Sequence, residues 1–92
     1  MEIRWSLPAA EDLERICERI ESDNPEAARR VAQTIYEGCS QLRTFPHLGR
    51  ASSRIAGRRE LRFSLLPYVA VYRLLENGIE ILRIFHGAQN WP

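Results

Sequence analysis

The sequence lacks any long apolar run. No stretch approaches the roughly 18 consecutive apolar residues of a membrane-spanning helix. The charges of Glu2 and Arg4 stand where a signal peptide would begin its apolar segment. We therefore expect no membrane segment and a cytoplasmic protein. The 92 residues are 45% hydrophobic and 27% charged, an ordinary globular balance, so we expect a single domain over residues 1–92.

Motifs for thiol, metal or phosphate chemistry are equally scarce. Cys17 and Cys39 are the only cysteines, and each falls on the apolar face of an expected helix. We interpret both as small buried hydrophobic residues rather than as a disulfide or metal ligands. No glycine-rich phosphate-binding pattern is present, so nucleotide hydrolysis and dinucleotide binding have no support. The sequence therefore indicates neither a metal nor a cofactor.

Lysine is absent, and all 13 basic side chains are arginines. Biased codon usage explains the missing lysine as well as function does, but the placement of the arginines is more informative. Residues 1–42 hold five arginines and nine acids, net −4, whereas residues 43–92 hold eight arginines and three acids, net +5. A basic C-terminal half predicts an anionic partner: a nucleic acid, an acidic protein segment, or both.

Three strand-like runs fill the last third of the chain. Residues 60–65 alternate between apolar and polar side chains, residues 68–75 are largely β-branched and aromatic, and residues 79–85 are nearly all apolar. Between the last two runs, Asn77-Gly78 predicts a two-residue hairpin loop, because a type I′ turn needs positive φ at both central residues.

That loop predicts a register. It places Leu74 opposite Ile81, Val69 opposite His86, and Tyr72 opposite Arg83, which is a cation–π geometry. Because side chains alternate along a strand, one face of the hairpin is expected to pack on helices. That face comprises Ala70, Tyr72, Leu74, Ile79, Ile81, Arg83 and Phe85. The opposite face comprises Val69, Val71, Arg73, Leu82, Ile84 and His86.

Two helices are predicted upstream of these strands, after a short opening strand over residues 2–5. Pro8 suits a first helical turn, and an apolar stripe then continues to about Ser22, with the acids of this segment, Asp12 included, expected on the solvent face. Asn24-Pro25 begins a second helix that ends near Arg43. The short link makes an antiparallel helix hairpin. We predict an α+β fold in the order β-α-α-β-β-β, with an antiparallel sheet packed on that hairpin.

An irregular, arginine-rich loop over residues 44–57 is the expected functional region, because binding residues gather on loops. The candidates for binding a target or partner are Arg50, Arg54, Arg58, Arg59, Arg83 and Trp91. Arg83 also has a structural alternative in its pairing with Tyr72, and Trp91 in packing on the core. Histidine near a strand end could act as an acid or base, so His86 is a catalytic candidate, with a plain strand-end residue as the alternative.

The ordered motifs resemble the RelE/ParE superfamily of type II toxin–antitoxin toxins over essentially the whole chain. The residues that carry the resemblance are 5–13 (WSLPAAEDL), 45–50 (FPHLGR), 59–61 (REL), 67–73 (PYVAVYR) and 79–88 (IEILRIFHGA). The resemblance implies a small toxin that a cognate antitoxin wraps and neutralises. RelE-like members cut mRNA on the ribosome with basic residues and a C-terminal histidine or tyrosine, whereas ParE-like members poison DNA gyrase.

Within that resemblance, a nuclease would use His86, Arg62 and Arg73 as catalytic residues. Val69 stands where some of the nucleases carry an arginine, and the ending Arg83-x-x-His86-Gly87-Ala88 looks more like ParE relatives. The resemblance therefore favours a gyrase poison. An mRNA interferase, which is an endoribonuclease, and an inactive relative acting as a binding module are the alternatives. Expected partners are an antitoxin and either gyrase or the ribosome with mRNA, in a homodimer or a toxin–antitoxin hetero-oligomer.

Overall fold

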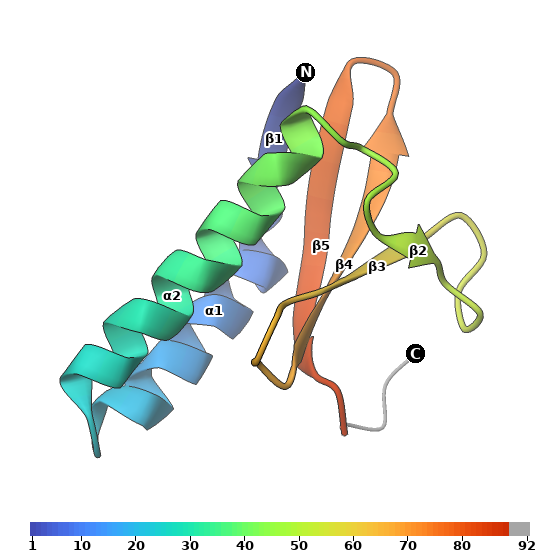
Figure 1. Ribbon diagram of the computed structural model, residues 1–92. Coiled ribbons are helices and arrows are strands. Elements are labelled where there is room, and N and C mark those ends of the chain that lie inside the picture. The colour runs from blue at the N-terminus through green and yellow to red at the C-terminus, as the bar shows by residue number, and fades with distance from the viewer. Residues whose placement is uncertain (89–92) are drawn as a thin grey trace.

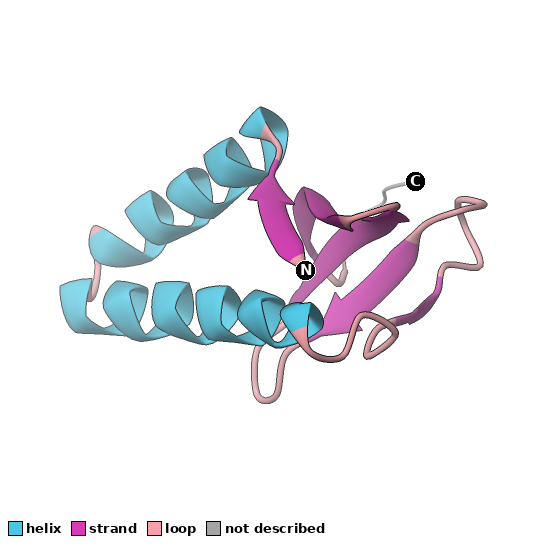
Figure 2. Ribbon diagram, turned by 90° about the horizontal axis from the view of Figure 1, so that it is seen from above, coloured by secondary structure: helices cyan, strands magenta, loops and turns pink. Residues whose placement is uncertain are grey.

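An antiparallel pair of helices covers one face of a five-stranded sheet (Figures 1 and 2). The computed structural model describes residues 1–88. The elements follow in the order β1 (Glu2–Trp5), α1 (Leu7–Glu21), α2 (Pro25–Ser40), the 3-10 turn η1 (Gln41–Arg43), β2 (Arg50–Ala51), β3 (Arg59–Arg62), β4 (Tyr68–Leu75) and β5 (Gly78–His86). The predicted α+β class and helix hairpin are confirmed. None of the helices described has the length and apolarity to cross a bilayer.

The sheet differs from the prediction at both edges. Its strand order is β1-β5-β4-β3-β2, and β1 runs parallel to β5, so the sheet is mixed rather than antiparallel throughout. The helix hairpin carries the chain from β1 back across the sheet, and the last strand then lies beside the first. At the other edge, Arg50 and Ala51 of the expected loop pair with β3 as a short strand.

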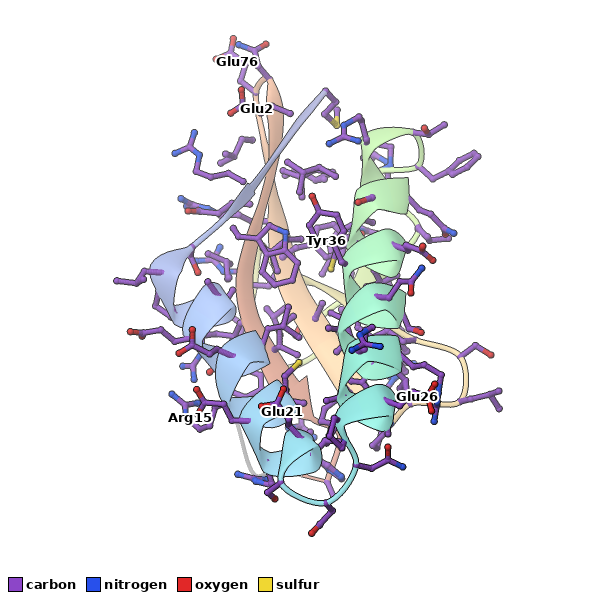
Figure 3. The ribbon with its side chains drawn as sticks, turned by 90° about the vertical axis from the view of Figure 1, so that its left-hand side faces the viewer. Glu2, Arg15, Glu21, Glu26, Tyr36 and Glu76 are labelled. Carbon is purple, nitrogen blue, oxygen red and sulfur yellow. The ribbon has the colours of Figure 1, made fainter. Side chains whose placement is uncertain are left out.

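The helices begin where the capping residues predict. Ser6 accepts a hydrogen bond from the Ala9 amide at 3.1 Å, and Asn24 accepts one from the Ala27 amide at 3.0 Å. At the far end of α2, the side chain of Tyr36 turns toward β1, where its ring stacks on Trp5 with centroids 6.4 Å apart (Figure 3). The opening strand is therefore held to the helices as well as to the sheet.

The buried stripe of α1 contains a carboxylate. Ala9 is fully buried, and Asp12 is only 4% exposed although it was expected on the solvent face. That expectation is wrong, because Asp12 lies three residues after Ala9 and therefore on the same side of the helix. Ala10, an apolar residue of the same helix, is exposed.

The β4–β5 loop is displaced by one residue from the predicted position. Leu75 pairs with Gly78, so the two loop residues are Glu76 and Asn77. A Cβ atom at Gly78 would lie 2.5 Å from the Glu2 carbonyl oxygen. Glycine at this position thus permits the close approach of β1 to β5. The hairpin prediction could not include this constraint, because it uses only the residues around the loop.

A β-bulge then changes the facing of the second half of β5. Tyr72 pairs with Ile81 but Val71 pairs with Arg83, so Leu82 is the extra residue. Beyond it, Ile84 joins the helix-facing core, and Phe85 joins a cluster on the outer face. The predicted facing was therefore correct for Ile79 and Ile81 before the bulge and wrong for Ile84 and Phe85 after it.

Each face of the sheet carries its own apolar cluster. The helix-facing core is the larger and includes Ala9, Ile35, Leu42, Leu61, Tyr72, Ile79, Ile81 and Ile84. The outer face carries a smaller cluster, Val69, Val71 and Phe85, with Ile55 packed against it. The outer face of the sheet is consequently apolar at its centre rather than cationic.

Tyr72 ties the long loop to the sheet. Its side chain is fully buried, and its hydroxyl donates to the Pro46 carbonyl at 2.8 Å and accepts from the Gly49 amide at 2.9 Å. A Cβ at Gly49 would lie 2.7 Å from the Tyr72 ring. Contact this close requires glycine, so residues 46–49 are held directly against the ring.

Tyr72→Phe is expected to lower the free energy of unfolding by about 1–3 kcal/mol, because it leaves a buried amide without an acceptor. Urea denaturation measures the change. Tyr36→Phe is the matched control, since the Tyr36 side chain is 61% exposed and its hydroxyl can be hydrated. Equal losses in the two variants would contradict a specific role for the Tyr72 hydroxyl.

Candidate partner-binding site

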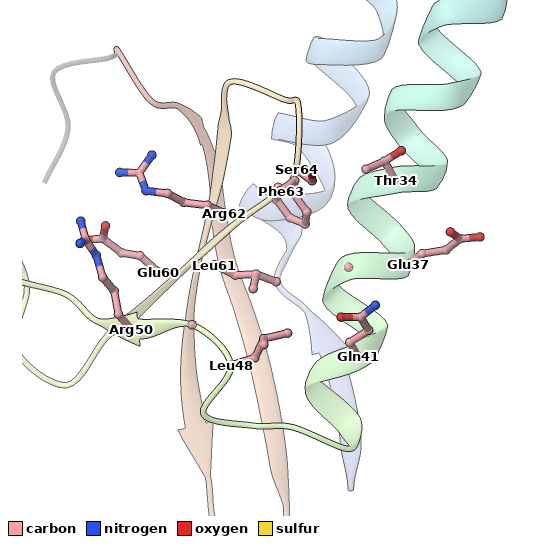
Figure 4. Close-up of a pocket in the computed structure, with 12 residues that line it drawn as sticks. Thr34, Glu37, Gln41, Leu48, Arg50, Glu60, Leu61, Arg62, Phe63 and Ser64 are labelled. Atoms are coloured by element: carbon pink, nitrogen blue, oxygen red, sulfur yellow. The ribbon is translucent and has the colours of Figure 1, made fainter.

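A groove lies between α2 and β3. Its volume is about 620 Å³, and its walls come from three segments: the C-terminal half of α2, residues 48–50, and residues 60–64 (Figure 4). Leu48, Leu61 and Phe63 point into the space between β3 and α2, whereas Arg50, Glu60 and Arg62 point away from the helix (Figure 4). The groove therefore has an apolar floor, with Arg50, Glu60 and Arg62 along its β3 side and Glu37 on its α2 side.

Gly38 shapes this floor. A Cβ atom there would lie 2.6 Å from the Phe63 ring, so the absent side chain lets the ring pack directly against α2. Phe63 is 7% exposed and Leu61 is 5% exposed, while Leu48 at the entrance is 49% exposed. The accessible apolar surface of the groove is therefore concentrated at Leu48, where a partner side chain could cover it.

Of the loop arginines, Arg59 has a clear structural role. Its Nε donates to the Gly49 carbonyl at 2.8 Å, and its Nη2 donates to the His47 carbonyl at 3.4 Å. Arg59 therefore binds the same loop, residues 46–49, that the Tyr72 hydroxyl binds. Arg58 is half-buried, and Arg50 and Arg54 are exposed. Trp91 lies outside the described residues.

The three residues expected in a nuclease site are not brought together. Arg62 lies opposite Val69 on the outer face. Arg73 lies on that face too, but about 13 Å farther along the strand direction, and it forms an ion pair with Glu80 at 2.7 Å. His86 faces the helices, its ring edge-to-face with Tyr68 at 5.7 Å. The prediction that Arg73 and His86 share a face is wrong, because the bulge at Leu82 switches the side chains that follow it to the opposite face of the sheet.

Arg83 binds a carboxylate of α1. Its Nε and Nη2 donate to the two oxygens of Asp12 at 2.7 and 3.0 Å, and the Ile84 amide donates to the same carboxylate at 2.9 Å. The guanidinium also lies over the Phe85 ring, 4.8 Å from its centroid. The predicted cation–π pairing with Tyr72 is therefore wrong, and the structural interpretation of Arg83 rests on Asp12 instead.

Comparison with known proteins identifies the family. The model of the ParE toxin of the type II toxin–antitoxin system parDE matches residues 3–91. The chain belongs to the ParE toxin family.

Relatives of the toxin cover nearly its full length. The Sinorhizobium fredii protein Y4kP is 40% identical over 98% of the chain and 92% of its own. Toxin RelE2 of Caulobacter vibrioides is 32% identical over 96% of the chain and 97% of its own. A solved chain from the chromosomal ParDE system of P. aeruginosa superposes with a TM-score of 0.84 at 31% identity, covering 94% of the toxin and 95% of that chain.

Asp12 is the residue of this toxin that sequence reasoning missed. Its position three residues after Ala9 and four before Ile16 places it within the apolar stripe of α1, which was the available signal. A charged residue in such a stripe needs a partner from another element. Identifying that partner as Arg83 requires the tertiary structure, because 71 residues separate the two.

The surroundings of Asp12 lower its pKa. Burial by itself raises the pKa, but the Arg83 hydrogen bonds, the Ile84 amide, the Arg83 charge and the Arg15 hydrogen bond together outweigh it. By contrast, burial raises the pKa of the Cys39 thiol to about 12, which keeps it protonated and unreactive at neutral pH. Its predicted burial is confirmed.

Asp12→Asn is expected to lower the free energy of unfolding at pH 7 by about 1–3 kcal/mol, because hydrogen bonds to a charged group are lost. In the parent toxin, the contribution of Asp12 is complete above its ordinary pKa of 3.8 and declines as the pH falls through the lower folded value. The variant should lack that share of the acid dependence. Denaturation curves between pH 2.5 and 7 measure both effects.

The matched control is Arg15→Ala, which removes the outer partner of Asp12. The Arg15 side chain is 62% exposed, so its ion pair contributes about 0–1 kcal/mol, and the acid dependence should persist in this variant. An Asp12→Asn protein with the stability and acid sensitivity of the parent would show that the carboxylate has no structural role.

Proposed function

We propose that this toxin inhibits growth by binding and poisoning DNA gyrase. We further propose that its cognate antitoxin neutralises it by occupying the groove between α2 and β3. Membership of a type II toxin–antitoxin family implies the antitoxin. The target and the binding site are the parts that we propose.

The apolar centre of the outer face is the observation that carries the gyrase proposal. An RNA-cleaving site must activate a 2′-hydroxyl, stabilise a pentavalent phosphate and protonate a leaving oxygen, so its groups must converge. Within residues 1–88, Val69, Val71 and Phe85 form a buried apolar cluster on that face, and Ile55 packs against it. His86 faces the opposite way. A poison, by contrast, needs a complementary binding surface and no such convergence.

An mRNA interferase is the second candidate, because RelE1 and RelE2 of Caulobacter vibrioides align with 91% and 96% of the chain. This function would have to use Arg62 or His86 separately, or assemble them on a partner. It predicts cleavage of translated mRNA that depends on His86. The His86→Ala variant should therefore lose activity if the toxin is an interferase and keep it if the toxin is a gyrase poison.

Purified toxin is expected to inhibit supercoiling of relaxed plasmid by gyrase, and His86→Ala is expected to inhibit it equally. Agarose gel assays measure supercoiling, and mapping of mRNA ends after induction without the antitoxin measures cleavage. Codon-positioned cuts that disappear in His86→Ala, with normal supercoiling, would replace the gyrase proposal by the interferase. No growth effect on induction would support an inactive binding module.

The chemistry of the groove supports an amphipathic, acidic antitoxin segment as its occupant. The apolar floor can bury one face of such a segment, and Arg50 and Arg62 lie along the margin next to Glu60 (Figure 4). Glu37 lies on the α2 side of the groove, so its four charged lining residues sum to zero, and acidic side chains of the segment are favoured only along the β3 side, next to Arg50 and Arg62. Affinity would come chiefly from burying Leu48 and the floor beneath it.

Leu48→Glu is expected to weaken antitoxin binding about 10- to 100-fold, equivalent to about 1.4–2.7 kcal/mol, because it places a charge in the apolar contact. Calorimetric titration of toxin with antitoxin measures the affinity. Leu7→Glu is the matched control, since Leu7 is 71% exposed at the start of α1, away from the groove. Unchanged affinity in Leu48→Glu would exclude the groove as the antitoxin site.

A further inference from the structure

A second hollow lies on the other side of the helix hairpin, between α1 and the C-terminal end of β5. Its volume is about 490 Å³. Arg15 and Arg19 of α1 line one side, Arg83 and His86 of β5 line the other, and Tyr68 of β4 lies between them. The hollow shares no residue with the groove between α2 and β3. It is therefore a separate feature of the molecule.

Asp12 is the one carboxylate among the residues that line this hollow, and its oxygens are already occupied. One oxygen accepts from Arg83 and from Arg15, the latter at 3.2 Å. The other accepts from Arg83 and from the Ile84 amide. Each oxygen therefore has two donors, which is about its full capacity. Asp12 cannot neutralise a further cation of the hollow.

Arg19 supplies the charge that Asp12 leaves unbalanced. Within the described part of the chain, the Arg19 guanidinium forms no hydrogen bond or ion pair, and the residue is exposed. Arg15 projects from the outer side of α1 (Figure 3), where it lies beside Glu11, Glu14 and Glu18. The excess positive charge of the hollow therefore rests chiefly on Arg19 and on the outer edge of Arg83.

We propose that this hollow is a phosphate-binding site. Guanidinium groups match the geometry and charge of a phosphate better than those of a single carboxylate, because the oxyanion offers several acceptors to a planar fork of donors. The volume exceeds that of a bare phosphate and falls within the roughly 300–1,000 Å³ of small-ligand sites. The rings of Tyr68 and His86 offer a nucleobase an aromatic wall.

The phosphate belongs either to a free nucleotide or to the backbone of a nucleic acid strand. In both cases the charged group is the same, and Arg19 and Arg83 would contact it. The proposal does not rest on the identity of the target, because it concerns only the residues around Asp12. A toxin that leaves gyrase unaffected could still bind phosphate here, and a toxin that inhibits gyrase could lack phosphate binding.

The experiment is a titration of isotope-labelled full-length toxin followed by amide NMR, at constant ionic strength. The probes are inorganic phosphate, adenosine monophosphate and a thymidine octanucleotide. We expect saturable shifts of the Arg19, Ile84 and His86 amides. In Arg19→Glu, affinity should fall by about tenfold or more, because a contacting cation is replaced by an anion. The variant leaves the Asp12 contacts intact, and its spectrum verifies the fold.

Arg30→Glu makes the same charge change on α2, at an exposed residue outside the hollow. Its affinity should stay near that of the parent. Tighter binding of the octanucleotide, which weakens steeply when the titration is repeated at higher salt, identifies a nucleic acid backbone. Equal or tighter binding of the mononucleotide identifies a free nucleotide. Absence of saturable shifts with every probe, or equal weakening in both charge-reversed variants, would overturn the proposal.

Discussion

The carboxylate of Asp12 is the contact on which the second half of β5 depends. Strand β1 accompanies β5 only as far as Ile81, and beyond that residue β5 has an open edge. Ser6, which caps α1, and Asp12 of α1 form hydrogen bonds to β5 beyond that residue. The Ser6 amide donates to the Ile81 carbonyl and the Ser6 hydroxyl to the Leu82 carbonyl, both at 2.9 Å, while Asp12 accepts from the Ile84 amide. Three backbone groups are thereby satisfied without a further strand.

The change of partner from β1 to α1 occurs at the bulge at Leu82. The bulge and the contacts to α1 together determine which side chains point to each face of the sheet. Arg83 is directed to α1, Ile84 enters the helix-facing core, and Phe85 passes to the outer face. The ion pair is partly open, since the Arg83 side chain is 45% exposed whereas that of Asp12 is 5% exposed. Losing Asp12 would leave a backbone donor and a cation without partners, which is more costly than the pair is favourable.

The two helices create different surroundings on the two sides of the hairpin. Against α2, glycine at residue 38 and the loop held by Tyr72 and Arg59 leave an apolar groove suited to a protein segment. Against α1, arginines gather around a carboxylate that is already saturated, which suits an anion. The outer face of the sheet carries the apolar cluster of Val69, Val71 and Phe85, with Ile55 packed against it. The two sides of the hairpin and the outer face of the sheet therefore differ in charge and in apolar surface.

The family resemblance, the α+β class, both helix starts and most of the strands followed from the sequence alone. These features depend on local chemistry: Ser6 and Asn24 cap helices wherever a helix follows, and alternation marks a strand whatever its neighbours. The grouping of arginines in the second half of the chain was equally visible, but not their roles. Arg59 was expected to face a ligand, and only the folded loop reveals its carbonyl partners.

Tertiary structure alone decided the pairing of β1 with β5, the bulge and the partner of Asp12. The Asn77-Gly78 pair has a hairpin sequence, yet its glycine serves the approach of Glu2 from the other end of the chain. One extra residue in β5 costs little locally, but it reverses every side chain that follows, which placed His86 apart from Arg62 and Arg73. Such features arise from contacts between segments distant in sequence, so no local pattern encodes them.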